Sequence, residues 1–93
     1  MPRAIVCATD DIAIGVCSAL RQKGFRIPQD VAVTGYDDIE MASYCTPPLT
    51  TVHVDPYRLG AESMDLLCRY MEDPGCPSTR ICLENELVIR ESS

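Results

Sequence analysis

The sequence predicts an α/β fold with a mostly parallel sheet and helices on its faces. Short apolar runs alternate with longer segments whose apolar residues recur at helical spacing, which is typical of β-α-β units. Such units join parallel strands through right-handed crossovers. The 93 residues correspond to one domain at most, and 46% hydrophobic with 24% charged residues is ordinary for a globular protein.

The first two predicted elements are a strand and a helix. Residues 4–8 form an apolar run that predicts a short buried strand. Residues 10–23 predict a helix, and Gly24 is a natural C-terminal stop for it. Four apolar residues of this segment follow helical spacing: Ile12, Val16, Ala19 and Leu20.

The middle of the chain predicts a second strand, a short helix and a third strand. A Pro-Gln-Asp turn at residues 28–30 introduces the strand at residues 31–34. Residues 39–44 favour a short helix, which the two prolines at 47–48 prevent from continuing. Residues 50–54 are rich in β-branched side chains, which favours a strand.

The remainder of the chain predicts a long helix and a final strand. Pro56 suits the first turn of a helix that extends to about Glu72. Asp-Pro-Gly at residues 73–75 ends this helix, and residues 81–89 alternate like a strand. We expect one stripe of the helix to face inward, formed by Leu59, Ser63, Leu66, Leu67, Tyr70 and Met71.

The most informative segment follows the strand at residues 31–34. Gly35 permits a sharp exit, and Tyr36, Asp37 and Asp38 then lie just beyond the carboxyl end of the strand. In open α/β sheets, ligands bind in the crevice beyond these strand ends. A carboxylate there suits a polyhydroxylated or amine-bearing ligand, because its two oxygens accept hydrogen bonds.

Four blocks of the sequence occur in the order and spacing of a known family. They are Asp10-Asp11-Ile12-Ala13-Ile14-Gly15, residues 26–38 (Arg-Ile-Pro-Gln-Asp-Val-Ala-Val-Thr-Gly-Tyr-Asp-Asp), residues 46–52 (Thr-Pro-Pro-Leu-Thr-Thr-Val) and residues 87–92 (Leu-Val-Ile-Arg-Glu-Ser). Over essentially all of its length, the chain resembles the closing third of lactose/galactose-repressor-type transcription regulators.

This resemblance implies a partial periplasmic-binding-protein-like (type I) domain with a Rossmann-type parallel sheet and flanking helices. It places residues 1–48 in the C-terminal lobe of the effector-binding domain. Residues 49–93 are then a hinge crossover and a segment that returns toward the other lobe. We expect the DNA-binding headpiece and the N-terminal half to be absent from this chain.

The implied function is that of a C-terminal fragment of a ligand-responsive bacterial transcription regulator. Its parent binds a small polar effector, a sugar or related metabolite, in the cleft between the lobes and signals to the headpiece. The alternative is a sugar-binding protein of a transport system, which shares the fold. The proline-containing crossover and the Gly-Tyr-Asp-Asp segment are more typical of the repressor branch.

The resemblance assigns effector contact to Asp37, for which capping of the helix at 39–44 is the other interpretation. Asp38 fits that cap better, because it directly precedes the apolar helix start, and we expect it to be structural. Family members often have a polar, effector-contacting side chain at the position of Thr9, whose hydroxyl can donate and accept. Tyr36 completes the candidate effector-binding set, with packing beside the hinge as its other role.

The family dimerises through its C-terminal lobe, and this property implies candidate interface residues. They lie on the first helix and on the segment before the two prolines: Ile14, Cys17, Met41 and Cys45. The alternative for Ile14 and Cys17 is that they cover the sheet, and helical spacing alone does not separate the two roles.

Acidic residues raise the alternative of an enzyme. Asp10 and Asp11 start a helix, where favourable interaction with the helix macrodipole is a sufficient account. Together with Asp37 and Asp38 they could also form a magnesium pocket like that of receiver domains. No residue fills the lysine role of that pocket, and no phosphate loop, Gly-x-Ser-x-Gly elbow or paired His nucleophile is present. We therefore predict a non-enzyme without cofactor or metal.

The six cysteines predict structural thiols rather than zinc ligands. No Cys-x-x-Cys pair occurs, and His53, the single histidine, fits a half-exposed strand residue. Cys7 and Cys82 fall in strand-like runs, and Cys17 and Cys68 fall in helical patterns. Between a glycine and a proline, Cys76 is the cysteine that we expect to be most exposed.

Charge and hydropathy bear on partners and location. The net charge is −6, and eight Lys and Arg are scattered among fourteen Asp and Glu, so this segment alone should not bind DNA. No apolar run approaches the ~20 residues of a membrane span, and the N-terminus does not read as a secretory signal. We expect a cytoplasmic protein.

As a fragment, the chain should not behave as a compact monomer. Each lobe would lack neighbouring strands, which leaves open sheet edges and uncovered apolar faces. We expect a homodimer, in which two copies could exchange the segment after Pro48, or a piece of a larger parent.

Overall fold

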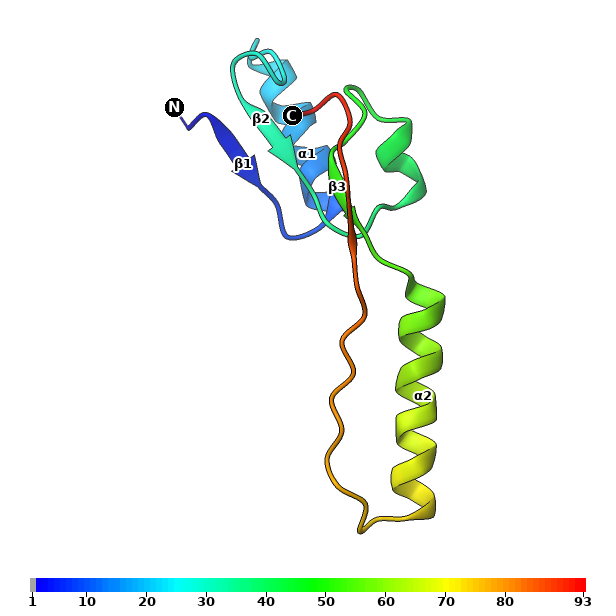
Figure 1. Cartoon of the computed structure of the whole chain (residues 1–93). Helices are drawn as coiled ribbons and strands as arrows, with labels where there is room; N and C mark the ends of the chain where they lie inside the picture. Colours follow the sequence, from blue (N-terminus) through cyan, green and yellow to red (C-terminus); the bar gives the residue numbers. More distant parts are fainter. Residues whose placement is uncertain (1) are drawn as a thin grey trace. The chain divides into compact units, whose positions relative to one another are not determined.

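The computed structural model describes residues 2–93 (Figure 1). Its strands and helices follow one another in the order β1 (Ala4–Val6), α1 (Asp10–Gln22), β2 (Ala32–Thr34), the 3-10 helix η1 (Glu40–Ser43), β3 (Thr51–His53), α2 (Pro56–Glu72) and β4 (Glu86–Val88). These elements belong to two compact units. Unit 1 contains the chain up to Val54 together with Glu86–Ser93, and unit 2 contains Asp55–Asn85.

The four short strands of unit 1 form two two-stranded sheets, which isolated bridges link. Strands β1 and β2 are parallel and joined through α1, with Ala4 opposite Ala32 and Val6 opposite Thr34. Two isolated parallel bridges, Thr34 to Thr50 and Asp37 to His53, continue the pairing from β2 toward β3. Strand β4 then pairs antiparallel with β3. The predicted parallel β-α-β arrangement is therefore confirmed, with an antiparallel strand added at one side.

Helix α1 begins and ends where local chemistry favours it. The Thr9 side chain accepts a hydrogen bond from the Ile12 amide at 3.3 Å, which satisfies one of the free amides of the first turn. Gly24, at φ 86°, adopts the left-handed conformation that follows many helices. The helix ends at Gln22, one residue before the predicted end.

The inward face of α1 agrees with the expected one only in part: Leu20 is buried and Val16 packs against the core, but Ile12 and Ala19 do not. Ala13, Cys17 and Leu20 are buried, whereas Ile12 is 53% exposed and Ala19 is also exposed. The small side chains of Ala13 and Cys17 let the helix lie close to the strands. The side of α1 with these smaller residues therefore packs against the sheet. Apolar spacing alone could not identify that side.

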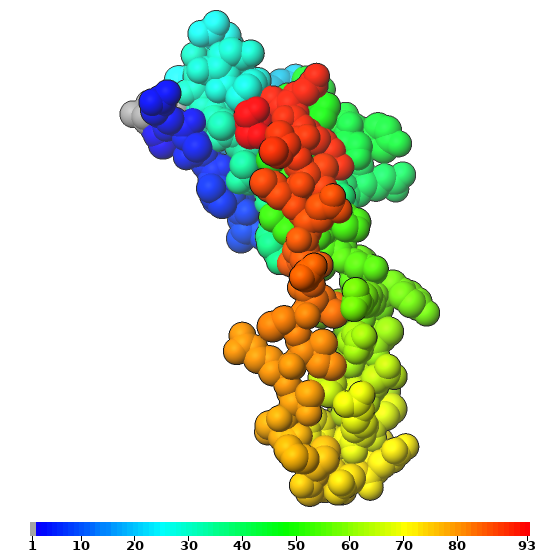
Figure 2. All heavy atoms as spheres, viewed as in Figure 1, coloured from blue at the N-terminus to red at the C-terminus, as the bar shows by residue number. Residues whose placement is uncertain are grey.

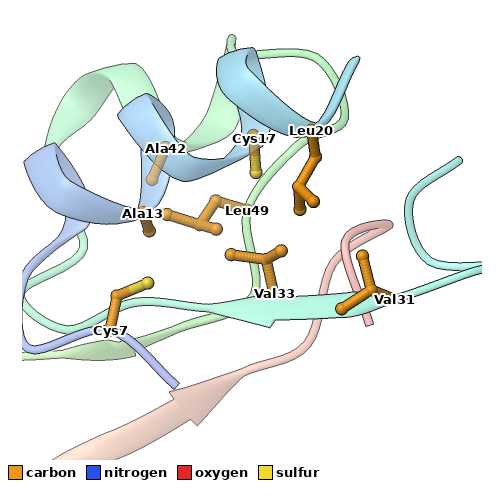
Figure 3. Packing of buried hydrophobic residues seen from close by; sticks show 8 residues of the cluster. All are labelled: Cys7, Ala13, Cys17, Leu20, Val31, Val33, Ala42 and Leu49. Carbon is orange, nitrogen blue, oxygen red and sulfur yellow. The ribbon is translucent and has the colours of Figure 1, made fainter. Parts of the chain in front are cut away.

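The core of unit 1 lies between α1, η1 and the sheet (Figure 3). Its buried hydrophobic residues are Cys7, Ala13, Cys17, Leu20, Val31, Val33, Ala42 and Leu49. Figure 3 shows that the side chains from α1 point toward Val33 and Leu49, which come from β2 and the segment before β3. Dispersion and burial of this small cluster hold the helices on the sheet.

Residues near the C-terminal end of the chain complete unit 1. The Ser92 amide donates to the Pro48 carbonyl at 3.0 Å, and the Val33 amide donates to the Ser92 carbonyl at 2.9 Å. The buried Ser92 hydroxyl donates to the Val33 carbonyl at 2.6 Å and accepts from the Thr50 amide at 2.8 Å. In Figure 2 these last residues, in red, lie on unit 1 beside the segment coloured cyan.

Unit 2 consists of α2 and an extended segment. Asp55 caps α2 by accepting from the Arg58 amide at 3.0 Å, and Pro56 occupies the first turn as predicted. The Tyr70 hydroxyl accepts from the Thr79 amide at 2.9 Å and donates to the Pro77 carbonyl at 3.2 Å, which anchors the segment after the helix.

Two expectations for the second half of the chain are wrong. No residue of α2 is buried: Leu66 and Tyr70 are half-buried, and Leu59, Leu67 and Met71 remain 51%, 51% and 70% exposed. The final strand covers Glu86–Val88 rather than residues 81–89, because its partner β3 is only three residues long. Within residues 2–93, no helix is long and apolar enough to cross a membrane.

Candidate functional site

The turn after β2 is built around a glycine with no room for a side chain. A Cβ on Gly35 would overlap Oδ1 of Asp10 and lie 3.0 Å from Cδ2 of Leu49. The Gly35 amide donates to the Thr50 carbonyl at 3.0 Å. This bond attaches Gly35 to the segment that leads into β3. The predicted sharp exit from the strand at Gly35 therefore also requires a close approach of backbone to side chain.

The two residues that follow Tyr36 adopt unusual backbone angles. Asp37 has φ 116° and Asp38 has φ 60°, a region that non-glycine residues rarely occupy. Such strain persists only where surrounding contacts impose it, and it is concentrated at ligand-binding positions. Here the Asp37 amide donates to the Val52 carbonyl at 3.0 Å, and the Tyr36 carbonyl accepts from the Asp10 amide at 3.0 Å.

The Asp37 side chain lies exposed at this strand end. Its carboxylate makes no hydrogen bond or ion pair with any residue in the part of the chain that the structure describes. The backbone position is thus fixed by neighbours while both carboxylate oxygens remain able to accept hydrogen bonds. This geometry is suited to a ligand with hydroxyl or amine donors.

Thr9 and Tyr36 lie at two neighbouring strand ends. Thr9 follows the β1 segment and Tyr36 follows β2, and the Asp10 amide bond to the Tyr36 carbonyl joins the two ends. Thr9 is half-buried and uses one oxygen lone pair as the cap of α1. Its hydroxyl hydrogen remains available for donation. Tyr36 is 39% exposed and takes part in other interactions within the chain.

Asp10 has a larger structural role than a helix-start residue. It is fully buried, and its Oδ1 accepts from the Thr51 hydroxyl at 2.6 Å. Its Oδ2 accepts from the Ile39 amide at 2.8 Å. One carboxylate thereby connects the start of α1, the segment after the Asp37–Asp38 turn and strand β3. A favourable interaction with the helix macrodipole, which the sequence suggested, does not account for these two hydrogen bonds. Their donors are 29 and 41 positions away in the chain, so no local sequence signal identifies them.

Asp38 is structural, but not as the predicted helix cap. The 3-10 helix η1 is preceded by Ile39, which makes no side-chain cap bond. The Asp38 carboxylate instead accepts from Arg90 Nη2 at 2.9 Å through Oδ1 and from His53 Nδ1 at 2.8 Å through Oδ2. Both Asp38 oxygens are thus engaged by His53 and Arg90 instead of by amides of η1.

Opposing effects act on the Asp38 carboxyl. Partial burial raises its pKa, whereas the hydrogen bonds and charges of His53 and Arg90 lower it, and together they hold the pKa below its ordinary value. Asp38 therefore stays ionised near neutral pH. An ionised carboxylate only accepts, so His53 Nδ1 carries the hydrogen of their shared bond. His53 itself is a half-exposed residue of β3, as predicted.

Arg90 and Ser92 are the structural residues that the sequence did not reveal. Arg90 Nη1 also donates to the Leu49 carbonyl at 3.0 Å, and the Arg90 amide donates to the Thr50 hydroxyl oxygen at 2.9 Å. Both residues lie in the last block of the family resemblance, but their partners are about 40 or more positions earlier. Only the folded chain brings these partners together.

The four candidate interface residues have different surroundings. Met41 is 53% exposed, and Ile14 and Cys45 are half-buried. Cys45 Sγ donates toward the Ala42 and Pro47 carbonyls, at 3.5 Å and 3.3 Å. Cys17 is 3% exposed and belongs to the core, which corresponds to the sheet-covering alternative left open by the sequence.

All six cysteines are free thiols. Burial raises the pKa of Cys7, Cys17 and Cys45, which keeps these thiols protonated. Cys68 and Cys82 are exposed and Cys76 is half-buried, so the expectation that Cys76 is the most exposed is wrong. In residues 2–93, no three His, Cys, Asp or Glu residues are grouped as metal ligands would be.

The arrangement defines a class of domain. A mainly parallel sheet carries a hydroxyl, a phenol and a free carboxylate at adjacent strand ends, as ligand-binding α/β domains do. Residues 1–93 match the family described as periplasmic binding protein-like domain, and the chain belongs to this family. The predicted fold class is thereby confirmed.

Similar proteins are transcription repressors and other transcription regulators. The chain is 41% identical over 91 residues to the ribose operon repressor of Haemophilus influenzae, covering 98% of this chain and 27% of the relative. Among solved structures, the transcriptional regulator CelR in complex with cellobiose matches with a TM-score of 0.90 at 35% identity, over 98% of this chain and 28% of that one. The lac repressor dimer bound to operator and the anti-inducer ONPF matches with a TM-score of 0.88 at 35% identity, over 99% and 32%.

These similarities confirm the resemblance to lactose-repressor-type regulators. They do not favour the alternative of a transport protein, since the relatives are transcription regulators. The chain spans only about a quarter to a third of their lengths, 27–32% in these three comparisons.

Proposed function

We propose that this chain is the C-terminal part of the effector-binding domain of a ligand-responsive bacterial transcription regulator. The observation that carries the proposal is the exposed Asp37 carboxylate, which has no partner within residues 2–93 although its backbone is tightly held. A ligand with hydrogen-bond donors would use this acceptor. The similarity to the ribose operon repressor and to CelR supports the regulatory role.

The effector is a small polar molecule, a sugar or a related metabolite. Asp37 accepts hydrogen bonds from it, Thr9 donates its hydroxyl hydrogen, and Tyr36 lines the same end of the sheet. Charge-assisted bonds to a carboxylate are stronger than neutral ones, so Asp37 contributes most of the three. The cellobiose complex of CelR supports this ligand class, because a saccharide offers many hydroxyl donors.

DNA binding belongs to another segment of the regulator. The net charge of −6 without a basic cluster does not suit a phosphate-binding surface. The regulator acts in the cytoplasm, as a homodimer, and has no catalytic activity. Ile14, Met41 and Cys45 contribute to the subunit contact. Cys17 supports this surface from the core beneath it.

Replacement of Asp37 by Ala in the full-length regulator tests the proposal. The variant leaves an effector donor unpaired, which should cost about 1–3 kcal/mol of binding free energy. We expect affinity for the effector to fall by roughly tenfold or more, measured by isothermal titration. Asp11→Ala is the matched control, because Asp11 is an exposed aspartate of the first turn of α1. Unchanged affinity of the Asp37 variant would remove Asp37 from the site.

A further inference from the structure

Asp38 contacts both segments that connect the two units. Its partner His53 is the last residue of β3, and this part of unit 1 ends one residue later, at Val54. Its other partner, Arg90, lies just beyond β4, in the segment that re-enters unit 1 at Glu86. The two oxygens of one carboxylate are therefore shared between the outgoing and the returning segment. We call Asp38, His53 and Arg90 the carboxylate bridge.

The two arms of the carboxylate bridge differ in strength. The side chains of Asp38 and Arg90 are only 15% and 20% exposed, so their charge-assisted bond is largely shielded from water. The His53 side chain is 50% exposed, and exposed pairs contribute little. Arg90 also donates to the Leu49 carbonyl, which attaches the returning segment to the start of the crossover. The arm through Arg90 is the main connection.

The carboxylate bridge is adjacent in sequence to the candidate effector contact. Asp37 and Asp38 are consecutive residues with positive φ. A change in the backbone angles of Asp37 therefore changes the direction in which the Asp38 side chain points. The Asp37 amide donates to the Val52 carbonyl, and the Val54 amide donates to the Asp37 carbonyl at 3.5 Å. Strand β3 and the residue after it are therefore hydrogen-bonded directly to this turn. Strand β4 has no such direct bond to the turn in the described residues, and Asp38 supplies its link through Arg90.

We propose that Asp38 is a positioning residue that couples the Asp37 turn to both connecting segments, so that effector binding at Asp37 is transmitted to the path between the units. This inference rests on the proposed function and specifies its regulation. The role proposed for Asp38 is not effector contact, because its side chain is only 15% exposed and both oxygens already accept bonds from His53 and Arg90.

Hydrogen–deuterium exchange of the ligand-free full-length protein tests the coupling. In Asp38→Asn, one of the two oxygens is replaced by an NH2 group, which donates and cannot accept a hydrogen bond from His53 or Arg90. We expect amides in residues 50–54 and 86–92 to exchange several-fold faster, with α1 and α2 unchanged. Arg90→Gln should reproduce the change at residues 86–92, and the double variant should add nothing further. Asp11→Asn is the control, because Asp11 is an exposed aspartate of the first turn of α1 with no bond to either segment among the described residues, and it should leave both rates unaltered.

A second arm of the experiment adds D-ribose or cellobiose as probe. In the wild type, a saccharide that binds should slow exchange at residues 36–39 and at residues 86–92. In Asp38→Asn, protection at residues 36–39 should remain while protection at residues 86–92 is lost. A merely structural role would instead change exchange uniformly along the chain.

The two arms separate failure of this inference from failure of the proposed function. If neither saccharide protects residues 36–39 of the wild type, the proposed sugar effector is contradicted, and the ligand-free rates still decide the role of Asp38. Unchanged or uniformly raised exchange in Asp38→Asn overturns the coupling. Loss of protection at residues 36–39 in that variant also overturns it, since Asp38 would then act on binding itself.

Discussion

Three aspartates close to one another in the fold have three distinct environments. Asp10 is fully buried with both oxygens bonded to neutral donors, Asp38 is bonded to the Arg90 guanidinium and the His53 ring, and Asp37 is exposed without a partner among residues 2–93. Buried polar groups need partners, and the first two have them. The third keeps its hydrogen-bonding capacity for another molecule. Side-chain surroundings, rather than residue type, therefore separate the binding residue from the structural ones.

The lowered pKa of Asp38 predicts a pH-dependent contribution to stability. A carboxyl whose pKa is lower in the folded state stabilises the fold above its unfolded-state value of about 4 and loses this contribution as the pH falls through the folded-state pKa. At pH 7, Asp38→Asn should lower the free energy of unfolding of the full-length protein by about 1–3 kcal/mol. The difference between wild type and variant should shrink as the solution is acidified.

Urea unfolding of both proteins between about pH 7 and pH 3 measures this difference. Asp11→Asn, at an exposed position of the first turn of α1, serves as the control for general carboxylate effects. A difference that stays constant across the pH range would show that titration of Asp38 does not contribute to stability.

Residue roles could be predicted from the sequence only where a local rule applied. The strand-end rule placed Asp37 beyond β2, and the structure places it there, although its contact with an effector remains a prediction. Capping preference suggested Asp38 as a cap, but its carboxylate is bonded to His53 and Arg90 instead. The roles of Arg90 and Ser92 depend on hydrogen-bond partners far away in the sequence, so the residues next to them do not indicate these roles.

Among the elements, the helices were easier to predict than the strands. Helix α2 has the predicted bounds and α1 ends one residue early, because caps, Pro56 and Gly24 are local signals. Each strand is three residues long and shorter than predicted. A strand extends only where a partner strand is present, and partners cannot be identified from alternation within one segment.

The subunit contact proposed above involves α1. The buried face runs through Ala13, Cys17 and Leu20, and Ile14 borders it while remaining partly accessible. In the proposed homodimer of the full-length regulator, Ile14→Glu would place a charge in a desolvated contact, so we expect this variant to be a monomer. Light scattering at micromolar concentration measures the mass.

Ala19→Glu is the matched control, because Ala19 is exposed on the flank of α1 far from Ile14. We expect the Ala19 variant to remain dimeric. If the Ile14 variant also keeps the mass of a dimer, Ile14 covers the sheet and lies outside the interface.

At the scale of the whole molecule, large apolar side chains remain in contact with water. Val6 is 82% exposed on β1, Leu87 is 62% exposed on β4, and Tyr57 and Met71 of α2 are 86% and 70% exposed. Strand β1 also pairs only with β2 in the described sheet, so its other edge is open. Exposed apolar faces and unpaired strand edges favour association with other polypeptide chains.

The 93-residue polypeptide prepared alone should therefore self-associate. We expect sedimentation equilibrium to give a mass above 10.3 kDa and unfolding midpoints that rise with protein concentration. Exchange of the segment after Pro48 between two copies would be one route to the dimer. A monodisperse 10.3 kDa monomer with concentration-independent, cooperative unfolding would contradict this expectation.

The Ser92 hydroxyl also constrains when the protein can fold during its synthesis. It lies between the Val33 carbonyl and the Thr50 amide, which are 59 and 42 positions earlier in the chain. A ribosome releases the N-terminal strands first, and unit 1 cannot close until the residues near position 92 have emerged. All of unit 2 is translated after Thr50 and before Ser92. During this time Val33 and Thr50 lack the Ser92 hydroxyl as a partner. Nascent chains stalled before Glu86 should consequently expose an unfinished sheet to chaperones and proteases.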